Sequence, residues 1–208
     1  HKFEDYLADI TNFYIFLKKY KKMEKPFFFG HNMGGLIAII LAAWKKLPLN
    51  GLILASPLIK LKTELTFLNR VMTKVLSVIC PGVSLSNNYI DPYALTHDLN
   101  IIEEYKIDPF ILNRINVRWL EQISGTIKKI FLTAPYIDTP SLIFHGDKDP
   151  LIDPAATKKF FYDLGTNEKV FYIIRGAYHE VFNELGREVF IDKFVEWIDI
   201  KNKEAKKN

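Results

Sequence analysis

The sequence has little cysteine and lacks long hydrophobic runs. Cys80 is the only cysteine among 208 residues, so neither an internal disulfide nor a thiolate zinc site can form. No stretch reaches the roughly eighteen uninterrupted apolar residues that a membrane-spanning helix needs. The longest candidate, residues 33–44, is short and carries two glycines near its start. These absences exclude a disulfide-built secreted scaffold and predict a cytoplasmic or peripheral-membrane protein.

The sequence also has little excess charge of one sign. Its 28 basic and 24 acidic residues give a net charge of +4, and much of that excess lies in the C-terminal lysines of residues 201–207. Basic residues are not interleaved with aromatics on one face, so we expect no nucleic-acid partner. With 49% hydrophobic residues the chain can bury a core, and its length suits one domain over residues 1–208.

Apolar patterning predicts an α/β fold. Short continuous apolar runs bounded by glycine or proline are typical of strands in a parallel sheet that is covered on both faces. Steps of three and four between apolar residues indicate helices with one buried face. We expect strands over residues 27–29, 52–55, 141–144 and 170–174, and helices over 3–20, 36–44, 61–79, 101–123 and 181–200.

The pattern changes between the second and third expected strands. About eighty residues there show helical periodicity and no convincing strand. We therefore expect a helical lid insertion over residues 58–139, a place where α/β enzymes often keep substrate selectivity. The apolar stretch of residues 61–79 has three open interpretations: an acyl-chain wall, a membrane-facing surface, or packing within the lid.

Three short motifs follow expected strands. The segment Gly30-His31-Asn32-Met33-Gly34 has the Gly-x-x-x-Gly spacing of a nucleophile elbow between a strand and a helix. Residues 145–149 and His179 follow the third and fourth strands. The order elbow, acid, histidine, each on a loop after a strand, is typical of α/β-hydrolases.

These motifs resemble the monoacylglycerol lipase and lysophospholipase branch of the α/β-hydrolases. Residues 30–35 resemble that branch's Gly-His-Ser-Met-Gly-Gly. The other similar segments are Asp91-Pro92, Leu95-Thr96-His97-Asp98, Tyr105-Lys106-Ile107-Asp108-Pro109, Arg118-Trp119, His145-Gly146-Asp147-Lys148-Asp149, His179-Glu180 and Asn183-Glu184. The resemblance implies the C-terminal part of an α/β-hydrolase fold, whose first strands and second oxyanion donor would precede His1.

The resemblance also implies roles for particular residues. Asn32 occupies the nucleophile position, where the family has serine, and Asp149 orients His179, the general base. The backbone N–H of Met33 is an oxyanion donor, and His31 contacts substrate together with unspecified lid residues. We expect Asp149 within hydrogen-bonding reach of His179, with the imidazole directed toward Asn32. The implied substrate is a small acyl ester, a monoacylglycerol or a lysophospholipid, with no metal and no cofactor.

Asn32 departs from this pattern. A carboxamide nitrogen is not a useful nucleophile and offers no hydroxyl to deprotonate, so the acyl-enzyme route is closed. Three explanations stay open: an inactivating engineered change, a natural loss in a lipid-binding homologue, or a degraded gene. A non-catalytic acyl-lipid binder is the alternative function. Deamidation of Asn32 to a nucleophilic aspartate is a further route, which the bulky Met33 would slow.

The remaining polar residues near the motifs have plainer interpretations. We expect Asp147 to be a turn residue, although it is the nearest rival to Asp149 as the acid. His31 and His145 are expected to pack or hydrogen-bond rather than catalyse, and His97 is expected on the lid surface. Glu180 and Glu184 are expected to be helix-start charges.

Overall fold

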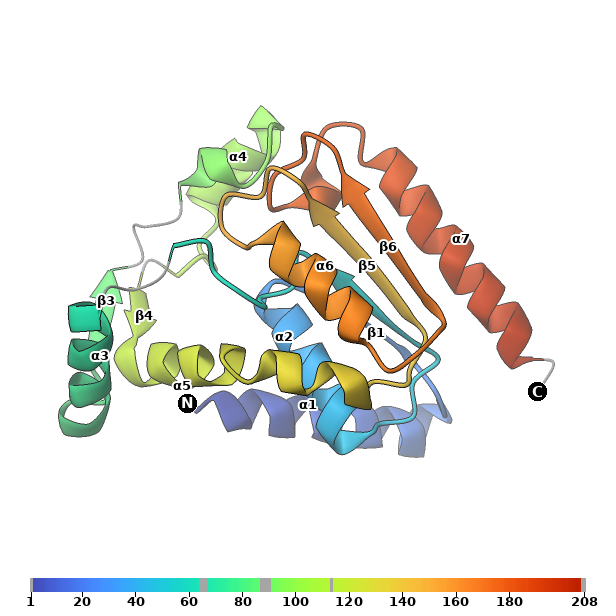
Figure 1. Cartoon of the computed structure of the whole chain (residues 1–208), viewed down its shortest axis with the longest axis horizontal. Coiled ribbons are helices and arrows are strands. Elements are labelled where there is room, and N and C mark those ends of the chain that lie inside the picture. The colour runs from blue at the N-terminus through green and yellow to red at the C-terminus, as the bar shows by residue number, and fades with distance from the viewer. Residues whose placement is uncertain (1, 64–66, 87–90, 113, 207–208) are drawn as a thin grey trace.

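The computed structural model describes residues 2–63, 67–86, 91–112 and 114–206. Within them, a four-stranded parallel sheet has the order β1-β2-β5-β6 (Figure 1). Its strands are β1 (Phe27–His31), β2 (Gly51–Ala55), β5 (Ser141–Gly146) and β6 (Lys169–Ile174). The α/β class and all four predicted strands are confirmed. Each strand extends one or two residues beyond its predicted range at one end.

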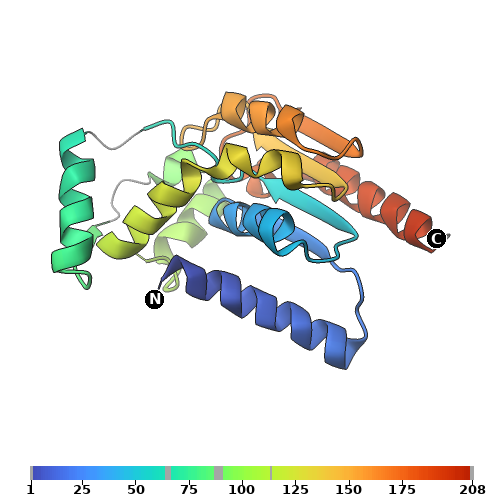
Figure 2. The same cartoon turned by 60° about the horizontal axis from the view of Figure 1, so that its bottom comes forward.

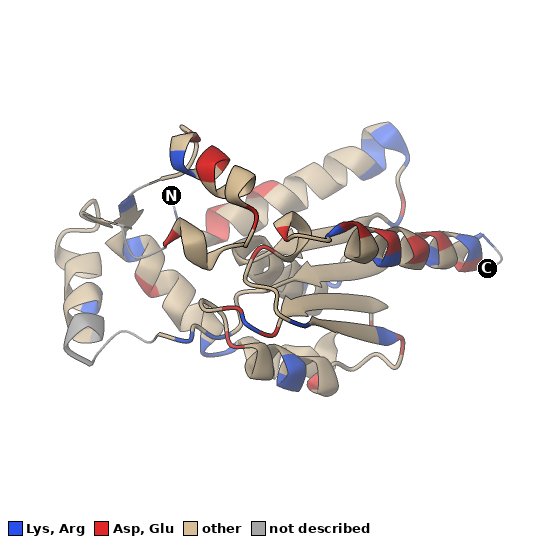
Figure 3. Cartoon of the chain, turned by 90° about the horizontal axis from the view of Figure 1, so that it is seen from above, with Lys and Arg blue, Asp and Glu red and all other residues tan. Residues whose placement is uncertain are grey.

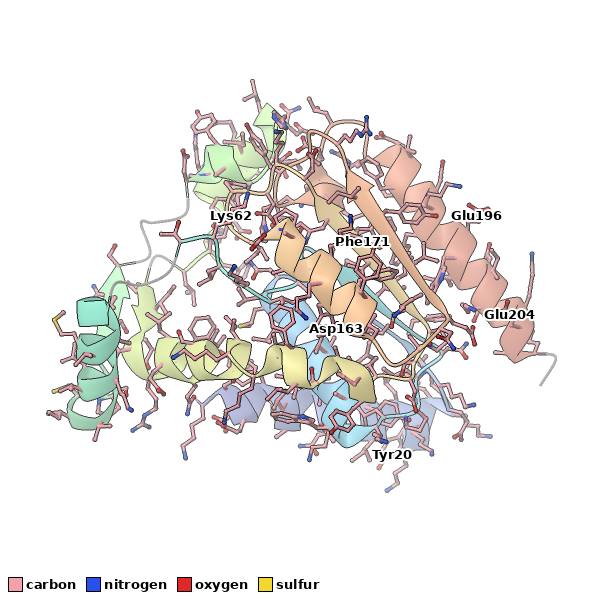
Figure 4. The ribbon with its side chains drawn as sticks, viewed as in Figure 1. Tyr20, Lys62, Asp163, Phe171, Glu196 and Glu204 are labelled. Atoms are coloured by element: carbon pink, nitrogen blue, oxygen red, sulfur yellow. The ribbon has the colours of Figure 1, made fainter. Side chains whose placement is uncertain are left out.

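Both faces of the sheet are covered. Leu52 and Leu54 of β2 pack into the cluster that contains α2 (Met33–Ile40) and α6 (Pro154–Asp163). Ile53 and Ala55 pack into the opposite cluster, with α7 (Glu188–Ala205). Figure 4 labels Phe171 of β6, whose ring stacks on Phe161 of α6 at 5.5 Å between centroids. Alternate residues of one strand therefore serve two cores, which explains the unbroken apolar runs in the sequence.

The first helix, α1 (Phe3–Lys21), confirms the predicted helix over residues 3–20. Asp5 accepts a hydrogen bond from the backbone N–H of Lys2 at 2.7 Å, which satisfies an amide at the helix start. Basic side chains gather at its C-terminal end, where cations favour the helix dipole (Figure 3). The helix lies outside the layer that contains α2 (Figure 2), and its Phe3 is buried against the larger core.

The helix expected over residues 36–44 is α2, which begins earlier, at Met33, and continues into a π-helical turn over Leu41–Lys45. The early start follows from the elbow, because Asn32 turns the chain directly from strand into helix.

The inserted segment differs from its prediction in two ways. The expected helix over residues 101–123 is instead α4 (Leu99–Ile107) and α5 (Val117–Ile127). Pro109 follows the end of α4, and the side chain of Asn116 caps α5 by accepting from the amides of Arg118 and Trp119. The expectation of no strand is also wrong, because β3 (Ser84–Ser86) and β4 (Arg114–Asn116) form an antiparallel pair.

The outer part of the insertion is helix α3 (Phe67–Ile79). The helix predicted over residues 61–79 is therefore confirmed over residues 67–79, while residues 64–66 lie outside the described residues. Leu61 instead forms an isolated antiparallel bridge with Ile152. Figures 1 and 2 both place α3 at the end of the molecule farthest from α7.

The predicted helix over residues 181–200 starts too early. Val181–Asn183 forms a 3-10 turn, and Gly186 has a φ of +74°, a conformation in which a side chain would be strained. Helix α7 then begins at Glu188 and extends to Ala205. None of the helices in the described ranges combines the length and apolar character needed to cross a bilayer.

Candidate active site

Asn32 lies at a sharp turn between β1 and α2. Its φ of +46° and ψ of −114° are unusual for a residue with a side chain. A Cβ on Gly30 would lie 2.5 Å from the carbonyl oxygen of Gly34, and one on Gly35 would lie 2.8 Å from Pro57. Gly34 itself has open space, so Gly30 and Gly35 are the two positions where sterics require glycine at this elbow.

The backbone of Asn32 is held on both sides. Its N–H donates to Ala55 of β2 at 3.1 Å, and its carbonyl accepts from Leu36 at 3.2 Å and Leu58 at 3.0 Å. The strained turn is thus fixed by the neighbouring strand, the helix it starts and the loop after β2. This support raises the Asn32 side chain at the carboxyl end of the sheet.

Asp149 is fully buried and accepts four hydrogen bonds. One carboxylate oxygen accepts from the amides of Leu151 at 2.8 Å and Ile152 at 3.0 Å. The other accepts from His145 at 3.0 Å and His179 at 2.8 Å. Burial opposes ionisation, but the hydrogen bonds from the two histidines outweigh it and hold the pKa of Asp149 well below its usual range.

His179 connects Asp149 to Asn32. Its Nδ1–H donates to Asp149 at 2.8 Å, which leaves Nε2 as an acceptor, and Asn32 Nδ2 donates to Nε2 at 3.0 Å. The expected geometry of acid, histidine and position 32 is therefore confirmed. Asp147 instead accepts from the amide of Gly176 at 2.7 Å, as expected of a turn residue.

His145 was expected to pack or hydrogen-bond, and the structure shows that its partner is Asp149. The side chain is completely buried, and its Nδ1 has no hydrogen-bond partner within the described residues. Its Nε2–H donates to the same carboxylate oxygen that receives His179. The sequence feature that could have indicated this pair is the four-residue spacing between His145 and Asp149, because the two ends of a tight loop after a strand can meet.

His31 and Glu180 form a second pair beside the first. His31 Nε2 lies 3.0 Å from Glu180 Oε1, and its Nδ1 lies 3.1 Å from the carbonyl oxygen of Ala55. The rings of His31 and His179 lie 4.8 Å apart. Burial raises the pKa of Glu180, but the hydrogen bond from His31 outweighs it and lowers that pKa overall. The expectation that Glu180 is a helix-start charge is wrong, because its carboxylate turns toward the elbow. A contact of His31 with substrate stays a prediction.

Glu184 joins the histidine loop to the inserted segment. It is buried and accepts from the backbone and ring of His97, at 2.9 and 3.0 Å, and from the amide of Tyr178 at 3.1 Å. These hydrogen bonds outweigh burial and lower its pKa. The expectation of a helix-start charge is wrong here too. His97 is half exposed but paired, and it packs against Tyr178 at 4.0 Å between ring centroids.

Two further contacts reinforce this junction. The amide of Glu180 donates to Leu95 at 2.8 Å, and Arg187 pairs with Asp98 at 3.0 Å. Tyr105 belongs to one of the segments that carry the family resemblance, although no role was predicted for it. Burial, and secondarily the charge of Glu180, raise the pKa of the Tyr105 hydroxyl.

The site lies at the carboxyl ends of the strands. A separate hollow lies at their amino ends and is lined by Lys25, Ala42, Lys46, Leu47, Pro48, Leu49, Asp138, Thr139 and Pro140. None of these residues belongs to the predicted site. In the part of the chain that the structure describes, His31, His179 and Glu180 form a group of three side chains that could hold a metal ion, with ligand atoms within 4.8 Å of one another.

Several known proteins are similar to this chain in sequence or in fold. Residues 1–186 match the family described as serine aminopeptidase, S33. Phospholipase YtpA of Bacillus subtilis is 28% identical over 89% of this chain and 71% of its own length. Human monoglyceride lipase is 28% identical over 85% of this chain and 61% of its own length. The crystal structure of Paleococcus ferrophilus monoacylglycerol lipase matches with a TM-score of 0.87 and 29% identity, over 97% of this chain and 76% of that one. The chain spans 60% of the monoacylglycerol lipase of Mycolicibacterium smegmatis.

Proposed function

The chain belongs to the serine aminopeptidase S33 family and has the α/β-hydrolase fold, and from this premise we propose a serine-esterase site for monoacyl lipids in which Asn32 has replaced the nucleophile. Asp149 and His179 keep the roles of acid and general base in this proposal. The backbone N–H of Met33, in the first turn of α2, is the proposed oxyanion donor, since first-turn amides have no partner within a helix.

One observation carries the proposal. Asn32 donates to the Nε2 of His179, while Asp149 accepts from Nδ1 of the same ring. A serine hydroxyl in a triad donates to the same nitrogen, and the histidine then removes its proton. The amide of Asn32 therefore preserves the hydrogen bond of the nucleophile without its chemistry, because a carboxamide cannot form an acyl-enzyme.

The proposed substrate is an ester of a single acyl chain. Relatives named monoglyceride lipase and phospholipase support a monoacylglycerol or a lysophospholipid. The inserted segment, proposed as a lid, exposes apolar side chains that suit contact with acyl chains or with a membrane surface. Those with the largest exposed fractions are Phe110 at 89%, Ile107 at 80%, Val78 at 77%, Leu112 at 74%, and Ile79 and Leu132 at 71% each.

The test restores the hydroxyl. We expect Asn32→Ser to hydrolyse a monoacyl ester at least about a thousandfold faster than the parent chain, because loss of a triad nucleophile costs about 10⁶ in kcat. A serine-directed phosphonate should label Asn32→Ser and leave the parent and Asn32→Ala unlabelled. Removing the base in the double variant Asn32→Ser, His179→Ala should abolish the gain. Equal turnover by Asn32→Ser and Asn32→Ala would contradict the proposed nucleophile position.

Retained lipid binding is the second function that this geometry favours. The amide of Asn32 pairs with Nε2 of His179, so the exchange of serine for asparagine leaves that nitrogen with a hydrogen bond. We expect the parent chain to bind a monoalkylglycerol, the ether analogue of a monoacylglycerol, which lacks a cleavable ester. Its affinity should be within about threefold of that of Asn32→Ser. Calorimetric titration of both proteins checks this, and absence of binding to both would contradict a lipid site.

A further inference from the structure

Three potential metal ligands surround the elbow. His31, His179 and Glu180 each offer one ligand atom, and these atoms lie within 4.8 Å of one another. The His31 and Glu180 side chains are 28% and 25% exposed, while His179 is almost completely buried. The group is therefore open to solvent on the side of His31 and Glu180, which provides an entry path for an ion.

His31 has two oxygen acceptors and no donor among its partners. Its Nδ1 lies 3.1 Å from the carbonyl of Ala55, and its Nε2 lies 3.0 Å from the carboxylate of Glu180. A neutral imidazole carries one N–H and can donate to only one of them. In the tautomer whose Nδ1–H donates to Ala55, the lone pair of Nε2 faces the Glu180 carboxylate, and a metal ion between these two atoms gives both of them a partner.

All three ligand groups have the supporting contacts that orient metal ligands. The Nδ1–H of His179 donates to Asp149, and that of His31 faces a backbone carbonyl. The second carboxylate oxygen of Glu180 accepts from Asn183 at 3.1 Å. Carboxylates and carbonyls on the far ring nitrogen are the partners that metal-binding histidines almost always have, because they fix the tautomer and aim the lone pair.

We propose that His31 Nε2, His179 Nε2 and the Glu180 carboxylate form a binding site for a divalent transition-metal ion such as Zn²⁺. Metal–ligand bonds of about 2.0–2.2 Å place neighbouring ligand atoms roughly 3–3.5 Å apart. The His31–Glu180 pair already has such a separation. Rotation of these partly exposed side chains brings His179 Nε2 onto the same ion, with solvent at the remaining position.

The ligand types select the metal. Two imidazole nitrogens and one carboxylate suit Zn²⁺, Ni²⁺ and Cu²⁺, whereas Mg²⁺ and Ca²⁺ prefer oxygen ligands throughout. Binding replaces the hydrogen bond from Asn32 to His179 with a metal–nitrogen bond. The three ligands are present whether position 32 is asparagine or serine, but a metal ion on His179 Nε2 occupies the nitrogen that acts as the general base in the proposed hydrolysis, so we expect the bound metal to inhibit ester hydrolysis by Asn32→Ser.

Calorimetric titration of the chelator-treated protein with ZnCl₂ tests the proposal. We expect one equivalent to bind, and His31→Gln and Glu180→Gln each to weaken binding at least about tenfold. His97→Gln is the matched control. His97 also pairs with a glutamate, Glu184, but it does not belong to the group of three proposed metal ligands. MgCl₂ should not bind. Absence of saturable Zn²⁺ binding, or equal affinity in the parent and both variants, would overturn the site.

A second readout covers variants that fail to fold. The chain has five histidines, so their imidazole resonances can be assigned one by one. Paramagnetic Ni²⁺ at substoichiometric amounts should broaden the His31 and His179 resonances of the parent chain before that of His97. Broadening of His97 first, or of all exposed histidines equally, would mean adventitious surface binding and would overturn the proposal.

Discussion

The carboxyl edge of the sheet and the outer end of the inserted segment are held by different forces. At the edge, Asp149, His179 and Glu184 are buried, and each forms hydrogen bonds with at least two other residues. On α3, Val78 and Ile79 expose more than 70% of their surface. The edge is therefore specified by many polar contacts that tolerate little change, whereas the exposed face of the outer helix contributes surface rather than stability.

This difference also explains how the site could stay intact after the proposed replacement of a nucleophile by Asn32. The Asp149 carboxylate is fixed by two backbone amides and two histidines, and of these four groups His179 contacts the side chain at position 32. The carbonyl of His179 accepts from Ser56 at 2.7 Å, which anchors its backbone independently. The arrangement of acid and histidine thus persists by structural support rather than by catalysis.

The largest effect on this comparison should come from Asp149→Ala. The change leaves two buried histidines and two amides without their acceptor, so we expect the free energy of unfolding to fall by about 3–5 kcal/mol. Urea unfolding followed by circular dichroism measures it. Asp147→Ala, two residues away on the same loop, is the control and should cost less than half as much. Equal losses of unfolding free energy would show that Asp149 stabilises the fold no more than Asp147 does.

Glu184→Gln should have an intermediate effect. One of its carboxylate oxygens accepts from the His97 ring and the Tyr178 amide, and an NH₂ group there would face two donors. We expect a loss of about 1–3 kcal/mol. The exposed Glu104→Gln on α4 is the matched control, with a change below about 0.5 kcal/mol. A Glu184→Gln protein as stable as the control would mean that the junction with the inserted segment does not support the histidine loop.

Acid should weaken the edge through the same carboxylates. The pKa values of Glu180 and Glu184 are lowered in the folded protein, so their ionised forms stabilise the fold at neutral pH. That contribution is present above the unfolded pKa and is lost as the pH falls through the folded pKa. We expect the thermal midpoint to fall from about pH 5 downward, and less steeply in Glu184→Gln. A midpoint that is constant down to pH 3 would contradict this linkage.

The smallest effect should come from the outer helix. Val78→Ser removes an apolar side chain that is 77% exposed, and we expect less than about 0.5 kcal/mol of change in the free energy of unfolding. Ile123→Ala on α5 is the contrast, since Ile123 is buried in the larger core and should cost about 2–5 kcal/mol. A loss above 1 kcal/mol for Val78→Ser would show that α3 is part of the stability core.

The sequence predicted the site better than the inserted segment, for a physical reason. An elbow, an acid loop and a histidine loop each follow a buried strand, and the carboxyl ends of parallel strands meet at one edge. The pairing of Asp149 with His179 then needs only the strand order. The break between α4 and α5 depended on Pro109 and on the Asn116 cap, which apolar periodicity does not register.

The partners of the remaining acidic residues were decided by the tertiary structure alone. In the sequence, Glu180 and Glu184 lie at the start of an apolar helical pattern, where acidic residues normally interact with the helix dipole. In the folded chain Glu180 meets His31, 149 residues away, and Glu184 meets His97, 87 residues away. Periodicity reports which face of an element is buried, but contacts this distant in the chain follow from how whole elements pack. The sequence by itself determined the α/β class and the turn at Asn32, because both follow from the local pattern of strand, glycine and helix. It named Asp149 and His179 as a pair through the resemblance to α/β-hydrolases, and the adjacency of β5 and β6 brought the two side chains together. Only the packing of the histidine loop against β1 and the inserted segment determined which charges surround that pair.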